Sequence, residues 1–253
     1  MALAGGPPKI FIVGDSTAAD YAPDRYPQMG WGQVLKCRLE EGVTVVNLAR
    51  GGRSSKSFIA EGLFSDIVKQ VAPGDTVLIQ FGHNDANVGS PERFTDPESD
   101  FRENLRAYVA VVRARSAVPV LITPVTRRVF VAGQATESHA AYSRAVRAVA
   151  AQTRTPLIDL SVSSRALLNR LGEERTERYY LNLWPEDRVA RFPQGVTDNT
   201  HFSETGARAM AALVAAGLKQ SGAPVGARVR AGPDAKAPQP VLGGPACPAA
   251  AGG

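Results

Sequence analysis

The chain has 253 residues, of which 44% are hydrophobic and 21% are charged, and this composition is typical of a globular protein with one sizeable buried core. Lysine and arginine total 29 against 24 aspartates and glutamates, but the basic residues form no stripe with interleaved aromatics, so we expect no nucleic-acid partner. No apolar run approaches the roughly 20 residues that span a bilayer, which excludes an integral membrane protein.

Short apolar segments alternate with amphipathic segments along the chain. Five apolar segments are rich in β-branched residues and are apolar on both faces, as the buried strands of a parallel sheet are. They lie at residues 9–14, 43–49, 75–82, 118–125 and 155–160. Helices are expected at residues 32–41, 55–70, 99–116, 135–153, 161–171 and 204–220. This alternation predicts an α/β fold, a three-layer α/β/α sandwich with a central parallel sheet.

Both ends of the chain differ in composition from residues 9–221, which we interpret as one folded domain. Residues 1–8 lack the long hydrophobic region of an intact signal peptide, and we interpret them as the remnant of a leader. Residues 222–253 are dominated by Pro, Gly and Ala without apolar periodicity, which predicts a disordered tail. The expected location is extracellular or periplasmic for a mature domain without its leader, with the cytoplasm as the alternative.

The chain has two cysteines, Cys37 in a predicted helix and Cys247 in the predicted tail. Neither belongs to a CxxC or Cys/His cluster, so we expect a structural or incidental role for both. A disulfide between them is conceivable, but the composition of the tail gives no reason to expect order around Cys247.

A serine follows the first predicted strand, where the ligand crevice of a parallel α/β sheet lies. Ser16 occupies a Gly-Asp-Ser-Thr turn, from which its hydroxyl can project beyond the sheet and its backbone N–H can face a developing oxyanion. A serine after a strand is also a common helix cap, and that reading stays open on this turn alone.

An aspartate and a histidine stand three positions apart just before the last predicted helix. A serine hydroxyl is a poor nucleophile at neutral pH and needs a base whose tautomer is held by a third group. Of the three histidines, only His201 has a carboxylate, Asp198, so placed in a predicted turn. Chance Asp/His spacings are common, and geometry decides between the two readings.

Two further segments offer donors for an oxyanion. Gly52 in Arg-Gly-Gly-Arg-Ser presents a backbone N–H, and Asn84 in Gly-His-Asn-Asp presents a side-chain amide. Taken singly, these residues are also explained by a tight turn and an Asx-turn.

Four of these segments occur in the order of the four SGNH hydrolase blocks. They are GDST with Ser16, ARGGRS with Gly52, FGHND with Asn84, and DNTH with Asp198 and His201. Over residues 9–220 the chain resembles the SGNH (GDSL) hydrolase superfamily, and it is most similar to the rhamnogalacturonan acetylesterases, which remove acetyl groups from pectin backbones. The resemblance implies a flavodoxin-like SGNH catalytic domain, with Ser16 as nucleophile, His201 as base oriented by Asp198, and an oxyanion hole from Ser16, Gly52 and Asn84. One departure is that the cysteines do not suggest the paired disulfides of some secreted members.

The resemblance implies a serine esterase that removes O-acetyl groups through an acetyl-Ser16 intermediate. The expected partner is an acetylated polysaccharide or oligosaccharide, and we expect a monomer. No HExxH, Walker or GxGxxG motif is present, so neither metal nor cofactor is expected. The alternatives are an SGNH esterase of other specificity, namely a xylan acetylesterase, lipase or thioesterase, and a non-catalytic carbohydrate-binding protein.

Arginines at strand ends motivate the hypothesis that the substrate is an acetylated, anionic or neutral polysaccharide fragment. The guanidinium groups of Arg53, Arg127 and Arg128 suit the carboxylates of galacturonate. Trp184 is a candidate for stacking on a sugar, in a predicted loop that also holds Tyr179, Tyr180 and Phe192. The alternative is that these aromatic side chains simply pack the loop.

Overall fold

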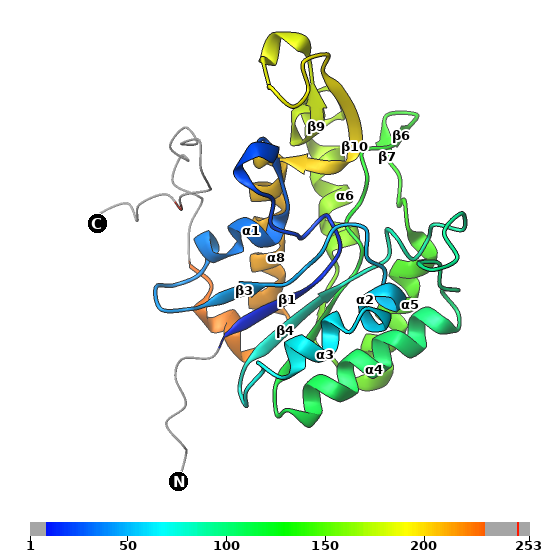
Figure 1. Cartoon of the computed structure of the whole chain (residues 1–253), viewed down its shortest axis with the longest axis vertical. Coiled ribbons are helices and arrows are strands. Elements are labelled where there is room, and N and C mark those ends of the chain that lie inside the picture. The colour runs from blue at the N-terminus through cyan, green and yellow to red at the C-terminus, as the bar shows by residue number, and fades with distance from the viewer. Residues whose placement is uncertain (1–8, 231–246, 248–253) are drawn as a thin grey trace.

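The central sheet of this protein is parallel and has five strands. The computed structural model describes residues 9–230 and 247. The strands are β1 (Ile10–Gly14), β3 (Val45–Asn47), β4 (Thr76–Gln80), β5 (Val118–Ile122) and β8 (Leu157–Ile158), in the order β3-β1-β4-β5-β8. Figure 1 shows β3, β1 and β4 side by side. All five strands predicted from the sequence are confirmed.

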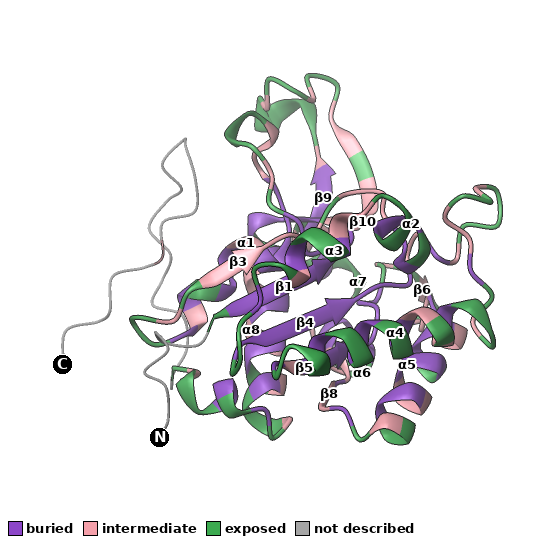
Figure 2. Ribbon diagram, turned by 60° about the horizontal axis from the view of Figure 1, so that its bottom comes forward, coloured by how far each residue is buried: buried purple, intermediate pink, exposed green. Residues whose placement is uncertain are grey.

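Helices cover both faces of the sheet, which confirms the three-layer α/β/α architecture. Alternate residues of β1 point into two cores: Ile10 and Ile12 into one, Phe11 and Val13 into the other. The first core is covered by α1 (Trp31–Leu35), α6 (Leu160–Leu171) and α8 (Glu204–Gln220), and the second by α2 (Ser55–Ala60), α3 (Leu63–Val68), α4 (Asp100–Ala114) and α5 (Ala140–Thr153). The central strands are buried, and the outer faces of the helices are exposed (Figure 2).

Three helices differ from the sequence-based expectation. The helix expected at 55–70 is interrupted at Gly62, whose φ of +74° ends α2 and begins α3. The helix expected from residue 135 begins at Ala140, because the preceding residues form a hairpin of β6 (Phe130–Val131) and β7 (Gln134–Ala135). The helix expected at 32–41 is α1 followed by the 3-10 turn η2 (Lys36–Arg38).

A second, antiparallel sheet was missed by the sequence analysis. It joins β2 (Gln28–Met29), β10 (Val196–Ser203) and β9 (Tyr180–Leu183), in the order β2-β10-β9. The expectation of a turn at Asp198–His201 was therefore wrong. These residues lie within β10, whose pairing with β9 shifts register between Asp198 and Phe202.

The folded domain continues past the predicted boundary at residue 221. The 3-10 helix η5 (Pro224–Arg228) buries Val225, and Val229 bridges to Leu39. The predicted disordered tail was thus wrong for residues 222–230. Burial of apolar side chains against α8 orders this segment in spite of its Pro, Gly and Ala content.

The two cysteines, which were expected to be structural or incidental, form a disulfide between Cys37 and Cys247. The predicted leader remnant at 1–8 and the rest of the predicted tail lie outside the described residues. Within residues 9–230, no helix combines the length and hydropathy needed to cross a membrane.

Candidate active site

The loop after β1 holds Ser16 at the carboxyl end of the sheet. The buried carboxylate of Asp15 accepts hydrogen bonds from the backbone N–H and the hydroxyl of Thr17, at 2.8 and 2.7 Å. The Tyr21 hydroxyl donates to the carbonyl of Ser16 at 2.9 Å. A Cβ atom on Gly14 would lie 2.8 Å from the carbonyl oxygen of Gln80, so this loop packs closely against β4. These contacts fix the backbone that presents the Ser16 hydroxyl.

The structure brings Ser16, His201 and Asp198 into one hydrogen-bonded chain. The Nε2 atom of His201 lies 2.9 Å from Ser16 Oγ, and its Nδ1 atom lies 2.7 Å from Asp198 Oδ2. The other carboxylate oxygen of Asp198 accepts hydrogen bonds from the backbone N–H groups of Thr200 and His201, at 2.8 and 3.0 Å. This arrangement fits a serine whose proton is accepted by an imidazole held by a carboxylate.

Asp198 stays ionised at neutral pH. Burial alone would raise its pKa, but hydrogen bonds from the ring and the backbone N–H of His201 outweigh this effect and lower the pKa to about 2. The carboxylate therefore accepts the Nδ1–H of the imidazole, which leaves Nε2 as the acceptor for the Ser16 hydroxyl.

Gly52 and Asn84 line the same cavity as Ser16. Asn84 Nδ2 donates one hydrogen bond to the carbonyl of Arg53 at 3.0 Å, so its second N–H is available to a ligand. Gly52 has a φ of +77°, a left-handed conformation that favours glycine. Both residues thus line the cavity that Ser16 also lines, and their role as oxyanion donors stays a prediction.

The buried carboxylate of Asp85 ties the loops around this cavity together. It accepts hydrogen bonds from the backbone N–H and hydroxyl of Ser55, from the Thr95 hydroxyl and from the backbone N–H of Gly82. Burial raises its pKa to about 6. The sequence analysis missed Asp85, although it directly follows Asn84 in the FGHND segment.

The cavity at Ser16 has a volume of about 580 Å³ and is rich in cationic side chains. Its lining includes four arginines: Arg25, Arg53, Arg93 and Arg127. Among the described residues that line it there is no aspartate or glutamate. Of these arginines, Arg25 and Arg93 were not singled out in the sequence.

Two neutral histidines, His83 and His139, also line this cavity. Their ring centroids are 4.2 Å apart, and burial lowers the pKa of both to about 3. His83 Nε2 bonds to the carbonyl of Val125 at 3.0 Å, whereas the buried Nδ1 of His139 has no partner among the described residues. Imidazoles in this state can donate or accept hydrogen bonds without adding charge.

The predicted substrate-binding arginines do not all reach the cavity. Arg53 and Arg127 line it; Arg53 pairs with Glu61 at 2.9 Å, and Arg127 Nε donates to the Thr200 hydroxyl at 2.7 Å. Arg128 lies elsewhere, where its guanidinium donates to the carbonyl of Glu173 at 2.8 Å. Its predicted position in the site was wrong, because its guanidinium bonds to the first residue of the short helix α7 (Glu173–Thr176) outside the cavity.

The predicted aromatic wall does not line the cavity at Ser16. Tyr180 is fully buried and donates to the carbonyl of Thr126 at 2.6 Å. Trp184 lines a separate cavity, and Tyr179 and Phe192 are half-buried and do not line the cavity at Ser16.

Across residues 9–230 and Cys247, no group of three His, Cys, Asp or Glu side chains is arranged to hold a metal ion.

Comparisons with known proteins agree with this geometry. Residues 12–209 match the GDSL-like lipase/acylhydrolase family. Over 216 residues the chain is 39% identical to the probable rhamnogalacturonan acetylesterase YesY of Bacillus subtilis, covering 85% of this chain and 94% of the relative. Over 220 residues it is also 39% identical to the rhamnogalacturonan acetylesterase RhgT of the same organism, covering 87% and 93%.

Solved structures share the fold. The crystal structure of YxiM from Bacillus subtilis matches with a TM-score of 0.72 and 31% identity, covering 85% of this chain and 57% of that one. Axe2, an acetylxylan esterase from Geobacillus stearothermophilus, matches in fold with a TM-score of 0.58 and 18% identity, covering 84% and 94%. The sequence match from the first strand into the last helix, together with these structural matches, shows that the chain belongs to the GDSL-like lipase/acylhydrolase family.

Proposed function

We propose that this chain removes O-acetyl groups from pectic rhamnogalacturonan through an acetyl-Ser16 intermediate. Its family makes it a carboxylic ester hydrolase, and relatives named as rhamnogalacturonan acetylesterases support the acetyl group and the pectic polymer. The observation that carries the proposal is the Ser16–His201–Asp198 chain of hydrogen bonds at a cavity lined by four arginines.

Acylation begins when Ser16 Oγ attacks the acetyl carbonyl carbon. His201 Nε2 accepts the hydroxyl proton, and ionised Asp198 stabilises the resulting imidazolium. The carbonyl oxygen becomes an oxyanion, which the N–H groups of Ser16 and Gly52 and the amide of Asn84 stabilise. The C–O bond to the sugar then breaks, and the sugar oxygen leaves with the proton from His201.

Deacylation repeats these steps with water. His201 accepts a proton from the water molecule while its oxygen attacks the acetyl-Ser16 carbonyl. The same donors stabilise the second oxyanion. Ser16 Oγ leaves with the proton from His201, and acetate is released.

The charge of the cavity supports a uronate polymer over a neutral one. Arg25, Arg53, Arg93 and Arg127 line it without a carboxylate among the described lining residues. Guanidinium groups bind carboxylates with two parallel hydrogen bonds, a geometry that galacturonate can satisfy and an unsubstituted xylose cannot.

Acetate release from acetylated rhamnogalacturonan, acetylated xylan and p-nitrophenyl acetate, measured side by side, tests the proposal. We expect the highest kcat/KM on rhamnogalacturonan and a covalent acetyl adduct detectable by mass spectrometry. The variant Ser16→Ala should lose at least about 1,000-fold of the activity on all three substrates. Equal kcat/KM values on both polymers would overturn the pectic specificity while leaving the esterase activity.

We also propose an extracellular or periplasmic location. The Cys37–Cys247 disulfide supports it, because disulfides persist in oxidising compartments and are rare in the cytosol of mesophiles. Fractionation of the producing cells, with thiol alkylation before lysis, tests this: alkylated cysteines in a cytosolic fraction would contradict it.

A further inference from the structure

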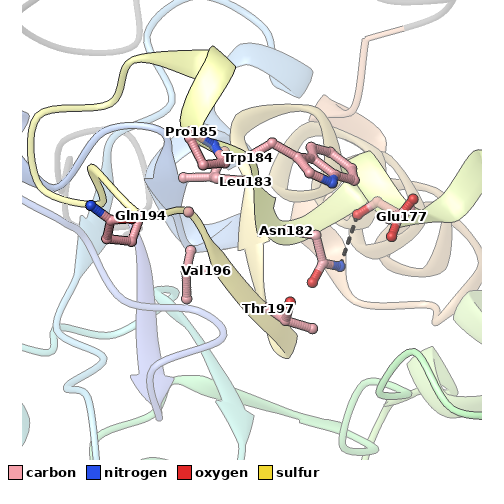
Figure 3. Close-up of a pocket in the computed structure, with 9 residues that line it drawn as sticks. Glu177, Asn182, Leu183, Trp184, Pro185, Gln194, Val196 and Thr197 are labelled. Atoms are coloured by element: carbon pink, nitrogen blue, oxygen red, sulfur yellow. Dashed lines mark hydrogen bonds between the residues drawn. The ribbon is translucent and has the colours of Figure 1, made fainter.

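A second cavity lies beside β10, outside the one that holds Ser16 (Figure 3). Its volume of about 360 Å³ falls within the range of small-molecule sites. β9 and β10 supply Asn182 and Thr197 to its wall, and the 3-10 helix η4 (Pro185–Asp187) and the residue before it supply Pro185 and Trp184. None of its lining residues contributes to the catalytic cavity.

Trp184 is an exposed aromatic side chain held in a fixed position. It is 37% exposed, whereas the other tryptophan, Trp31, is fully buried. The guanidinium carbon of Arg178 lies 3.6 Å from the centroid of the Trp184 ring. Asp187 anchors both residues: it pairs with Arg178 at 2.6 Å and accepts the backbone N–H of Trp184 at 2.8 Å. A fixed indole offers a flat apolar surface with little ordering cost on binding.

Three polar side chains line the same cavity as this ring. The side chains of Glu177, Gln194 and Thr197 line the cavity and make no hydrogen bond to any other described residue. They offer carboxylate, amide and hydroxyl groups to a ligand. A cavity that holds an apolar plane and such groups suits a sugar ring, which has one face of C–H groups and hydroxyls around its edge.

The charge of the second cavity differs from that of the first. Glu177 is its one charged lining residue in the described part of the chain, and the guanidinium of Arg178 behind the Trp184 ring is paired with the carboxylate of Asp187. Four arginines line the catalytic cavity. A carboxylate-bearing sugar is therefore favoured at Ser16, and a neutral sugar is favoured at Trp184.

One strand connects the two cavities. Thr197 lines the second cavity, and Thr200, three residues further along β10, lines the first. At about 3.3 Å per residue, these positions are roughly 10 Å apart along the strand, and the register shift between Asp198 and Phe202 breaks the regular alternation that would place them on opposite faces. A bound oligosaccharide of a few sugars spans such a distance.

We propose that the cavity at Trp184 is a subsite for a neutral sugar residue of the polysaccharide chain whose acetylated residue reacts at Ser16. The proposal rests on the proposed function in taking a polysaccharide as substrate. It adds a second point of attachment for the chain, away from the reacting ester, so that long substrates bind more tightly than short ones.

Kinetics on substrates of different length test this subsite. For Trp184→Ala, the KM for acetylated rhamnogalacturonan oligosaccharides should rise about tenfold relative to the KM for p-nitrophenyl acetate. Trp184→Phe should recover most of that loss, because it keeps an aromatic plane. The matched control is Val111→Ala on α4, since Val111 is also 37% exposed, and it should leave the ratio of the two KM values as in wild type. An unchanged ratio in Trp184→Ala, with wild type active on rhamnogalacturonan, would overturn the subsite.

Fluorescence separates this inference from the proposed function. Trp31 is buried, so a saccharide that binds at Trp184 changes the emission of that indole alone. In Ser16→Ala protein, deacetylated rhamnogalacturonan and xylan oligosaccharides are titrated as separate probes. A saturable change that disappears in Ser16→Ala/Trp184→Phe supports the subsite even if wild type releases no acetate from rhamnogalacturonan. The absence of a saturable change with both probes would overturn it.

Discussion

Asn182 on β9 accepts the backbone N–H of Asp198 on β10, at 3.0 Å through its Oδ1 atom. Its Nδ2 atom donates to the Asn199 side chain and to the carbonyl of Glu177, at 3.2 and 3.1 Å. The Asn182 side chain is buried, and both its amide nitrogen and its amide oxygen are hydrogen-bonded. It fixes the strand segment that carries the carboxylate of the hydrogen-bonded chain.

Asn182→Ala should therefore lower kcat on p-nitrophenyl acetate by about tenfold, because Asp198 loses part of its backbone support. The measurement is steady-state kinetics with the variant Asn87→Ala as control, since Asn87 is exposed and bonds only within its own loop. A wild-type kcat in Asn182→Ala would show that β10 holds Asp198 without this contact.

Asp198→Asn should lower kcat by about 10³- to 10⁴-fold, because an amide does not hold the imidazole tautomer that accepts the Ser16 proton. Kinetics on p-nitrophenyl acetate at pH 7 measure the loss. A loss below tenfold would mean that another group orients His201.

The same substitution should also change the dependence of stability on pH. The pKa of Asp198 falls from an ordinary 3.8 to about 2 in the folded protein, so its stabilising effect is full only above about pH 5 and is lost progressively as the pH falls through 3.8 towards 2. The difference in urea midpoint between wild type and Asp198→Asn should shrink as the pH is lowered from 5 to 4 and then to 3. A constant difference over this range would contradict the low pKa.

Asp85→Ala should destabilise the fold by about 3 kcal/mol or more, because it leaves several buried donors without an acceptor. Those donors are the N–H and hydroxyl of Ser55, the Thr95 hydroxyl and the N–H of Gly82. Urea unfolding measures the loss. Asp66→Ala is the control, because Asp66 forms an exposed pair with Lys69 and should change stability by less than about 1 kcal/mol.

Arg127 and Arg128 form a matched pair of neighbours with different surroundings. Arg127→Ala should raise the KM for acetylated rhamnogalacturonan about tenfold, because one guanidinium of the cavity is lost. Arg128→Ala should leave that KM near wild type and lower stability by about 1 kcal/mol, through its lost bonds to Glu173 and Asn199. Equal KM values for the two variants would contradict a role for Arg127 in substrate binding.

Much of the fold was predictable from the sequence because the five parallel strands are apolar on both faces. The antiparallel strand β10 was not, since Thr197, Asp198, Asn199 and Thr200 are all polar and show no alternation. Its place depends on pairing with β9 and β2, and that pairing has no local signal.

Ser16, Asp198 and His201 were predictable because Ser16 follows an apolar strand and the Asp/His pair comes shortly before the last helix. Their neighbours were not. Arg127 and Arg128 look equivalent in the sequence. Which of them faces the cavity depends on the direction of the backbone after β5. The role of Asp85 depends on Ser55 and Thr95, which are 30 residues before it and 10 residues after it.

The wide separation of Ser16 and His201, 185 positions apart in the chain, has a consequence during synthesis. Ser16 and most of the parallel sheet have already left the ribosome while the codon for His201 is still untranslated. Under the proposed roles of Ser16 and His201, esterase activity begins only after β10 has emerged and paired with β2 and β9, and a nascent chain halted before residue 196 lacks the base.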